Sequence, residues 1–237
     1  MGLSLHILGK FMGSLIEMTG PKRGIAMNSP VLVEFDMRIK TGEKEEDDLT
    51  LIDGATDYCD LTIPSVSFTH RIHGNCGAVD ITLARVYNAV EATIDVLVLK
   101  VQNGFNLSLS SFVFVGGSDQ EIPLFRGTTA ESCGLRRYVI AVKMDTWMQL
   151  KFKVGQNGSK NDHLERSCYF KANIHGCACQ QIMLQHAALS VKVRWGYPCN
   201  LETIWAPRMM TAMSFKIIVT LNDWVIAMIT SIMRSQM

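Results

Sequence analysis

The stretch Pro30-Val-Leu-Val-Glu-Phe-Asp-Met-Arg-Ile-Lys40 alternates apolar and polar side chains from one end to the other. Its apolar positions are Val31, Val33, Phe35, Met37 and Ile39. Because successive side chains of a β-strand point to opposite faces, this alternation predicts a half-buried antiparallel strand. The acidic run that follows, Thr41–Asp48, predicts a loop exposed to water.

The same period of two returns along most of the chain. The further alternating segments are residues 79–84, 90–98, 107–115, 137–144, 148–154, 168–174 and 189–195. Turn-forming residues separate several of them, namely Asn88, Asn103-Gly104 and Gly116-Gly117. Asp145-Thr146 lies between two alternating segments, and we expect residues 137–144 and 148–154 to form a hairpin around it.

Short alternating segments separated by turns, with no room for crossover helices, are typical of all-β proteins. The sequence therefore predicts an antiparallel β-sandwich of about seven or eight strands. We divide the chain into a divergent N-terminal leader (residues 1–18), a β-sandwich domain (residues 19–196) and a hydrophobic, Met-rich C-terminal tail (residues 197–237).

Both ends of the chain depart from the alternating pattern. Residues 3–18 place apolar side chains at nearly helical intervals, which predicts a short N-terminal helix. Residues 213–233 carry a helical stripe through Ile217, Leu221, Trp224 and Met228. Two strands, residues 215–221 and 224–232, are the alternative, and we prefer the helix. Because Lys216 and Asp223 interrupt the apolar run, we expect the tail not to span a membrane.

Composition narrows the class of protein. The 237 residues are 48% hydrophobic and 19% charged, with a formal net charge of +1. These values exclude disorder as the dominant state and give no support for binding nucleic acid or a membrane surface. The seven cysteines form no repeating framework, and the first residues make a poor signal peptide. We therefore expect a cytoplasmic or nuclear protein with reduced thiols.

Metal-binding and catalytic chemistry has few candidates. His175, Cys177 and Cys179 invite a metal site, with His70, His73 and Cys76 as further ligands. On an extended strand His175 and Cys179 would be about 13 Å apart, too far to bind one zinc ion. Such a site therefore needs a turn, which Gly176 could supply. We favour free or buried thiols over this site and expect no metal and no cofactor. No nucleophile motif is present, which indicates a protein that is not an enzyme.

A series of motifs runs through the predicted sandwich. They are Thr19-Gly-Pro-Lys-Arg-Gly24, Ser29-Pro-Val-Leu-Val-Glu-Phe-Asp-Met-Arg-Ile-Lys40, Leu51-Ile-Asp-Gly54, Gly77-Ala-Val-Asp-Ile-Thr82, Asn88-Ala-Val-Glu-Ala-Thr93, Glu121-Ile-Pro-Leu-Phe125 and Ser190-Val-Lys-Val-Arg-Trp195. In this order, over about residues 18–196, they resemble a plant domain of unknown function that is abundant in cereals. Its members are often named jasmonate-induced-protein-like.

The resemblance implies a non-enzymatic β-sandwich that serves as an interaction or accessory module in stress responses, with a protein as its partner. It transfers no catalytic residue and leaves the ligand and the oligomeric state open. Related domains accompany ribosome-inactivating N-glycosidase domains, so an accessory role beside such a domain is one alternative. A cryptic metal-binding protein is the other. Family members usually have more strands before Thr19 and stop soon after Trp195. Two interpretations of the ends of this sequence therefore stay open: genuine segments, or products of a truncated or mis-spliced gene model.

Overall fold

The computed structural model describes residues 14–16, 31–40, 44–58, 66–156, 163–184, 187–196, 212–221 and 228–236. Apart from one turn of 3-10 helix, η1 (Glu45–Asp47), the elements in these ranges are strands. In chain order they are β1 (Ser14–Ile16), β2 (Val31–Lys40), β3 (Leu49–Tyr58), β4 (Phe68–Gly74), β5 (Gly77–Val86), β6 (Ala89–Leu99), β7 (Phe105–Val115), β8 (Ser118–Thr129), β9 (Cys133–Gly134), β10 (Tyr138–Lys143), β11 (Trp147–Gln156), β12 (His163–Lys171), β13 (Gly176–Met183), β14 (Ala188–Gly196), β15 (Ala212–Leu221) and β16 (Met228–Gln236). No helix among the described residues is long or apolar enough to cross a membrane.

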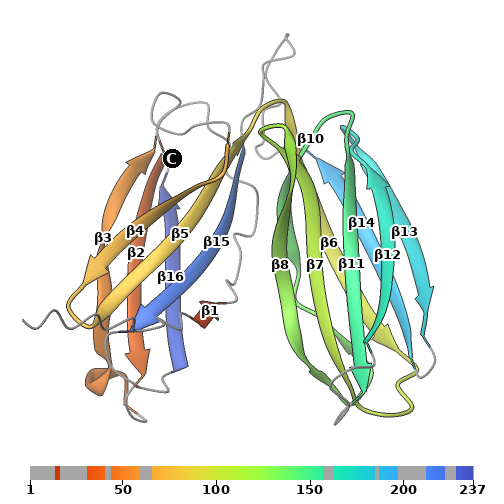
Figure 1. The fold of residues 1–237 in the computed structure, drawn as a ribbon, viewed down its shortest axis with the longest axis horizontal. Helices are drawn as coiled ribbons and strands as arrows, with labels where there is room; N and C mark the ends of the chain where they lie inside the picture. Colours follow the sequence, from red (N-terminus) through yellow and green to blue (C-terminus); the bar gives the residue numbers. More distant parts are fainter. Residues whose placement is uncertain are drawn as a thin grey trace, which may run out of the picture.

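The strands form four antiparallel sheets that make two sandwiches side by side (Figure 1). In the first sandwich, a sheet ordered β1-β15-β5-β4 lies against a sheet ordered β16-β2-β3. In the second, a sheet ordered β10-β6-β14-β13, with β9 beside β6, lies against a sheet ordered β12-β11-β7-β8. The prediction of an all-β antiparallel fold is therefore confirmed. The prediction of seven or eight strands is wrong, because the described residues contain more strands in more sheets.

The core of the first sandwich follows from the alternation in Pro30–Lys40. Val33, Phe35, Met37 and Ile39 of β2 are all buried, and the residues between them are more exposed. The opposite sheet contributes Val79, Ile81 and Leu83 of β5, none of which is exposed. Burial of such side chains stabilises the sandwich by roughly 25 cal/mol for each Å² of apolar surface removed from water.

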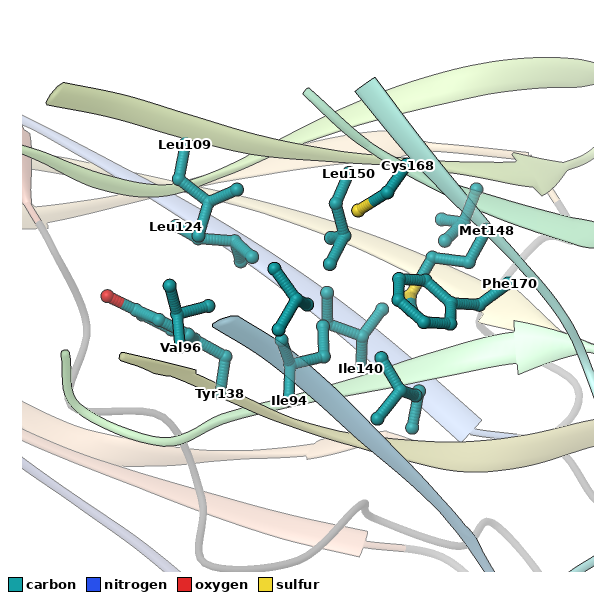
Figure 2. Packing of buried hydrophobic residues seen from close by; sticks show 14 of the residues in the cluster. Ile94, Val96, Leu109, Leu124, Tyr138, Ile140, Met148, Leu150, Cys168 and Phe170 are labelled. Carbon is teal, nitrogen blue, oxygen red and sulfur yellow. The ribbon is translucent and has the colours of Figure 1, made fainter. Parts of the chain in front are cut away.

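The second sandwich has a larger core, which Figure 2 shows from close by. Leu109, Leu150 and Cys168 from one sheet point toward Ile94, Val96 and Ile140 from the other. The row of Leu189, Val191, Val193 and Trp195 along β14 is buried, as the alternation predicts. Cys168, Phe170 and Ala172 are buried as well, whereas Ile174, which continues their row, is exposed.

Strand β5 connects the two sandwiches. Ala84 and Val86 at its end belong to the core of the second sandwich, although β5 pairs only with strands of the first. Asn88 follows with a positive φ of 48°, a conformation that Asn tolerates better than most residues, and β6 then begins in the second sandwich. The turn expected at Asn88 is therefore confirmed, and it passes the chain from one sandwich to the other.

The hairpin expected around Asp145-Thr146 is wrong. Strand β10 pairs with β6 in one sheet, and β11 pairs with β7 and β12 in the facing sheet. Asp145 has a φ of 60°, so the chain does turn tightly here. The turn carries the chain from one layer of the sandwich to the other, because β10 pairs with β6 in one sheet and β11 pairs with β7 in the facing sheet.

The helix expected over residues 213–233 is also wrong. Residues 212–221 form β15, which pairs with β5 from Ala212↔Val86 to Leu221↔Gly77. Residues 228–236 form β16, which pairs with β2. The alternative of two strands is correct for the described residues of both segments, yet these strands pair with β5 and β2 and not with each other. Trp224 lies outside the described residues. Free edges of β5 and β2 accept the tail, and their ladders satisfy backbone groups that a helix would satisfy internally.

The short helix expected over residues 3–18 does not form at residues 14–16. These three residues form β1, which pairs with β15. The rest of that segment lies outside the described residues.

Candidate functional site

The solvent-facing side of β11 and β12 carries two large aromatic side chains. On β11, Met148, Leu150 and Phe152 point into the core and are completely buried, so Trp147 and Gln149 point outward. On β12, burial of Cys168 and Phe170 likewise turns Tyr169 outward. Trp147 is 57% exposed and Tyr169 is 51% exposed. Two aromatic rings this exposed on the flat face of a sheet lose the favourable burial that such residues usually gain.

The strand register places the two rings close together. Trp147 lies opposite Lys171, and Gln149 lies opposite Tyr169, so Trp147 and Tyr169 are diagonal neighbours across the β11–β12 ladder. Diagonal neighbours lie roughly 7–8 Å apart, with their Cβ atoms somewhat closer, a distance within reach of aromatic side chains. The Nε2 amide of Gln149 donates a hydrogen bond of 2.9 Å to Ser167 Oγ beside them. We call Trp147, Gln149, Ser167, Tyr169 and Lys171 the aromatic surface.

Positive charge borders the aromatic surface. Lys153 and Lys151 both reach the carboxylate of Glu165, with N–O distances of 3.2 and 3.9 Å. The Lys151 ammonium also lies 5.0 Å from the ring centre of Phe112 on β7. Lys171 has no ion-pair partner among the described residues. The outer side of β11 and β12 therefore carries more ammonium groups than carboxylates.

The candidate metal ligands lie apart from this surface. Cys177 and Cys179 are exposed on β13, an edge strand of the opposite sheet, and His175 precedes them in the loop. Gly176, between His175 and Cys177, has a φ of 107°, which only glycine adopts without strain. His70 and His73 lie on β4 and Cys76 in the turn after it, in the first sandwich. Within the described ranges no group of three His, Cys, Asp or Glu side chains is arranged to hold a metal ion.

The histidines of β4 have other partners. His70 Nδ1 lies 3.2 Å from the hydroxyl oxygen of Tyr58, whose pKa is raised by burial. Beside His73, Asp80 accepts two hydrogen bonds of 2.6 Å from the Arg71 guanidinium. These bonds, with a smaller contribution from the charges of Arg71 and His73, hold the pKa of Asp80 below its ordinary value. The arrangement is a surface ion pair and not a reactive site.

A cavity of about 310 Å³ opens between β3 and β4 in the first sandwich. Phe35 and Leu51 supply part of its apolar lining, and Asp53, His73 and Asn75 supply polar groups. No hydrogen bond joins Asp53 to His73, so these residues do not form an acid–base pair. The cavity therefore carries no recognisable catalytic arrangement among the residues that line it.

Sequence reasoning missed the aromatic surface. The alternation of apolar residues alone singles out neither Trp147 nor Tyr169. The signal was present, because Leu150 and Phe152 fix the inward face of the segment at residues 148–154. A Trp on the opposite phase of such a strand must face solvent or a partner. The register that brings Tyr169 beside Trp147 could not be read from the sequence.

Comparison with known protein families finds a match over most of the chain. A family model described as a domain of unknown function (DUF6598) matches residues 10–193. No curated protein and no solved structure matches the chain. The matched residues include the motifs between Thr19 and Trp195, except for the last two residues of the final motif.

Proposed function

This chain belongs to the family defined by the domain of unknown function DUF6598, and we propose that it is a non-enzymatic module that binds a partner protein through its aromatic surface. The observation that carries the proposal is the exposure of Trp147 and Tyr169 as diagonal neighbours on one sheet face. Trp and Tyr are enriched among the residues that dominate binding energy at protein interfaces.

The chemistry of the surface suits a protein partner. Small molecules bind mostly in concave pockets, whereas a protein partner can cover the outer face of a sheet. The rings supply apolar area at the centre, and Gln149, Ser167 and Lys171 supply polar groups around it. This is the usual anatomy of an interface, with an apolar core and a polar rim. The surplus of ammonium groups favours a partner with acidic residues at the matching rim.

The groups at this surface support a role without catalysis. Acid–base or nucleophilic catalysis needs a nucleophile held within hydrogen-bond reach of a base. The Ser167 hydroxyl accepts its hydrogen bond from the amide of Gln149, which is not a base. The nearby carboxylate of Glu165 lies within reach of Lys151 and Lys153. We therefore expect binding without turnover.

The test compares two variants of the full chain as bait in quantitative pull-downs from stressed cereal tissue. Trp147→Ala/Tyr169→Ala removes both rings, and Met183→Ala removes an apolar side chain that is at least as exposed, from β13 on the opposite sheet. Truncation of interface anchors typically costs about 2 kcal/mol or more, so the double variant should bind the recovered partner at least ~10-fold more weakly. The Met183→Ala protein should bind like the parent chain. Equal recovery by both variants would contradict the proposal.

The proposal extends to the biological setting. The resemblance to cereal domains named jasmonate-induced-protein-like supports a role in a stress response. Seven cysteines without a repeating framework support a cytoplasmic or nuclear location. An accessory role beside a ribosome-inactivating N-glycosidase is the second candidate. Its support is that related domains accompany such N-glycosidase domains. A depurination assay on ribosomes separates the two, because the accessory role requires that adding this chain change the rate of an N-glycosidase.

A further inference from the structure

Cys177 and Cys179 place two thiols on one solvent-exposed face. Ile182 is buried and Ala178 is partly buried against the core, so the inner side of β13 holds the even-numbered residues. Cys177 and Cys179 therefore share the outer side, where both are exposed and neither forms a disulfide. Strand β13 is an edge strand, visible at the border of the second sandwich in Figure 1, so the described strands leave one side of the pair open.

The spacing of the pair fits one particular coordination geometry. Residues i and i+2 of a strand have Cα atoms about 6.6 Å apart. Strand side chains adopt χ1 values near both 180° and −60°, so rotation about χ1 turns the two sulfurs toward each other. A linear two-coordinate complex holds its sulfurs about 4.6 Å apart, which is twice a metal–thiolate bond of about 2.3 Å. Two soft thiolate ligands select Cu(I). We propose that Cys177 and Cys179 form a two-coordinate, linear site for Cu(I) on the outer face of β13.

Positively charged side chains lie directly across the ladder from the two cysteines. Cys177 lies opposite Arg194, and Cys179 lies opposite Lys192, both on the same outer face of β14. Arg194 donates to Asp95 at 2.8 Å, and Arg137 donates to the same carboxylate at 2.9 Å. Lys192 lies opposite Asp95, and Glu91 lies further along the same outer face of β6. Three cations and two carboxylates leave this patch with a small positive surplus. A bis-thiolate complex of Cu(I) carries one negative charge, because two thiols release two protons as one monovalent ion binds. The patch therefore stabilises the loaded site.

Other uses of the two thiols fit less well. Zinc prefers four ligands, and no third ligand joins the pair among the described residues. A disulfide between the two would hold Cα atoms at the upper limit of the usual 4.4–6.8 Å range, so β13 would have to bend out of its ladder with β14. A linear Cu(I) site requires neither a third ligand nor a bend in β13. It is also independent of the aromatic surface, which lies on the opposite sheet.

The experiment titrates the full, reduced chain with Cu(I) without oxygen, against a chromogenic chelator that competes for the ion. We expect one tightly bound Cu(I) per chain and an X-ray absorption spectrum of two sulfurs at about 2.2–2.3 Å. Cys177→Ser and Cys179→Ser should each weaken binding at least 100-fold. Cys133→Ser, which removes another exposed thiol, is the matched control and should leave the affinity unchanged.

Two further measurements complete the test. Lys192→Ala should weaken binding several-fold, with a difference that shrinks at high salt, because this residue acts only through its charge. A variant with Ser at Cys59, Cys76, Cys133 and Cys199 should retain the site. Unchanged affinity in Cys177→Ser, loss of the site in the four-serine variant, or a disulfide between Cys177 and Cys179 in the anaerobic protein would overturn the proposal.

Discussion

Cys168 shows how burial sets the chemistry of a single side chain. Its sulfur lies among Leu150, Met148 and Phe170 in the core of the second sandwich (Figure 2). Burial disfavours the charged thiolate and raises the pKa of Cys168 to about 12. Since the thiol keeps its proton when folded and loses it near pH 9 when unfolded, the folded state binds more protons in that range. Stability therefore falls as the pH rises from about 9 toward 12.

The fall in stability with rising pH gives the first prediction. At pH 10.5 the ionisation of Cys168 in the unfolded chain should cost the folded protein roughly 2 kcal/mol relative to pH 8. Urea unfolding of Cys168→Ala at the two pH values should show a smaller loss than the parent chain shows. Tyr58, whose pKa is also raised by burial, contributes equally to both proteins and cancels in the comparison. A loss of the same size in both proteins would contradict the prediction.

Ser111 carries a second residue-scale prediction. It lies on β7 in the core with no exposed surface, and its hydroxyl has no hydrogen-bond partner among the described residues. A buried polar group without a partner costs about 1–3 kcal/mol. Ser111→Ala removes that cost together with one small atom, so we expect the free energy of unfolding to rise by about 1 kcal/mol. Ser108→Ala, on the solvent side of the same strand, should change it by less than about 0.5 kcal/mol.

At the scale of elements, one bulge fixes how β3 meets β4. Met37 pairs with Ile52 and Arg38 pairs with Thr50, which leaves Leu51 as an extra residue. As a result Leu51 and Ile52 are both buried although they are adjacent in sequence. The Leu51 carbonyl then approaches Gly74 so closely that a Cβ atom at residue 74 would clash with its oxygen. Because the clash is with backbone, rotation of a side chain cannot relieve it.

Gly74→Ala should therefore destabilise the first sandwich by more than about 2 kcal/mol, since β3 or the β4–β5 turn must move. Gly54→Ala is the matched control, because a Cβ atom there meets nothing within 4 Å, and we expect a change within about 0.5 kcal/mol. Thermal unfolding of both variants checks the pair. Similar melting temperatures for Gly74→Ala and the parent chain would show that the two strands separate more easily than the structure indicates.

The elements also show how far the sequence predicts the fold. Alternation of apolar residues is a local property, so it correctly predicts strands such as β2, β6 and β14 and their buried faces. Strand pairing depends on contacts between distant segments, so the alternation could not predict that β10 and β11 lie in different sheets. Residues 213–233 fit a helical period and also, less well, two strands, and pairing with the open edges of β5 and β2 decides for strands in the described part of this segment.

At the scale of the whole molecule, the two sandwiches differ in how they use the chain. The second is built from consecutive strands β6–β14, whereas the first combines β1–β5 with β15 and β16. Strand β15 lies between β1 and β5 and is therefore an interior strand of its sheet. Without β15 and β16, the described strands of the first sandwich reduce to the pairs β4–β5 and β2–β3. Isolated two-stranded pairs are at best marginally stable in water.

Removal of residues 200–237 should thus unfold the first sandwich and leave the second folded. Hydrogen exchange followed by mass spectrometry reports on each separately. In the truncated protein we expect amides of β2 and β4 to exchange at least ~100-fold faster, because their sheets lose cooperative support. Amides of β11, buried in the second sandwich, should exchange at an unchanged rate. Protection of β2 equal to that in the full chain would show that the tail strands are dispensable.

The use of both chain ends in one sandwich has a consequence for synthesis on the ribosome. Strands β2–β5 emerge early, yet two of their neighbours, β15 and β16, are translated only after all of β6–β14. At about 5–20 residues per second, the nascent chain waits on the order of ten seconds with the edges of β2 and β5 unpaired. Exposed apolar edges invite pairing with other chains, so this interval is when the protein depends most on chaperones. A pause in translation before β15 would lengthen that exposure. Strands β6–β14 are already translated at that point, so the second sandwich could fold during the pause.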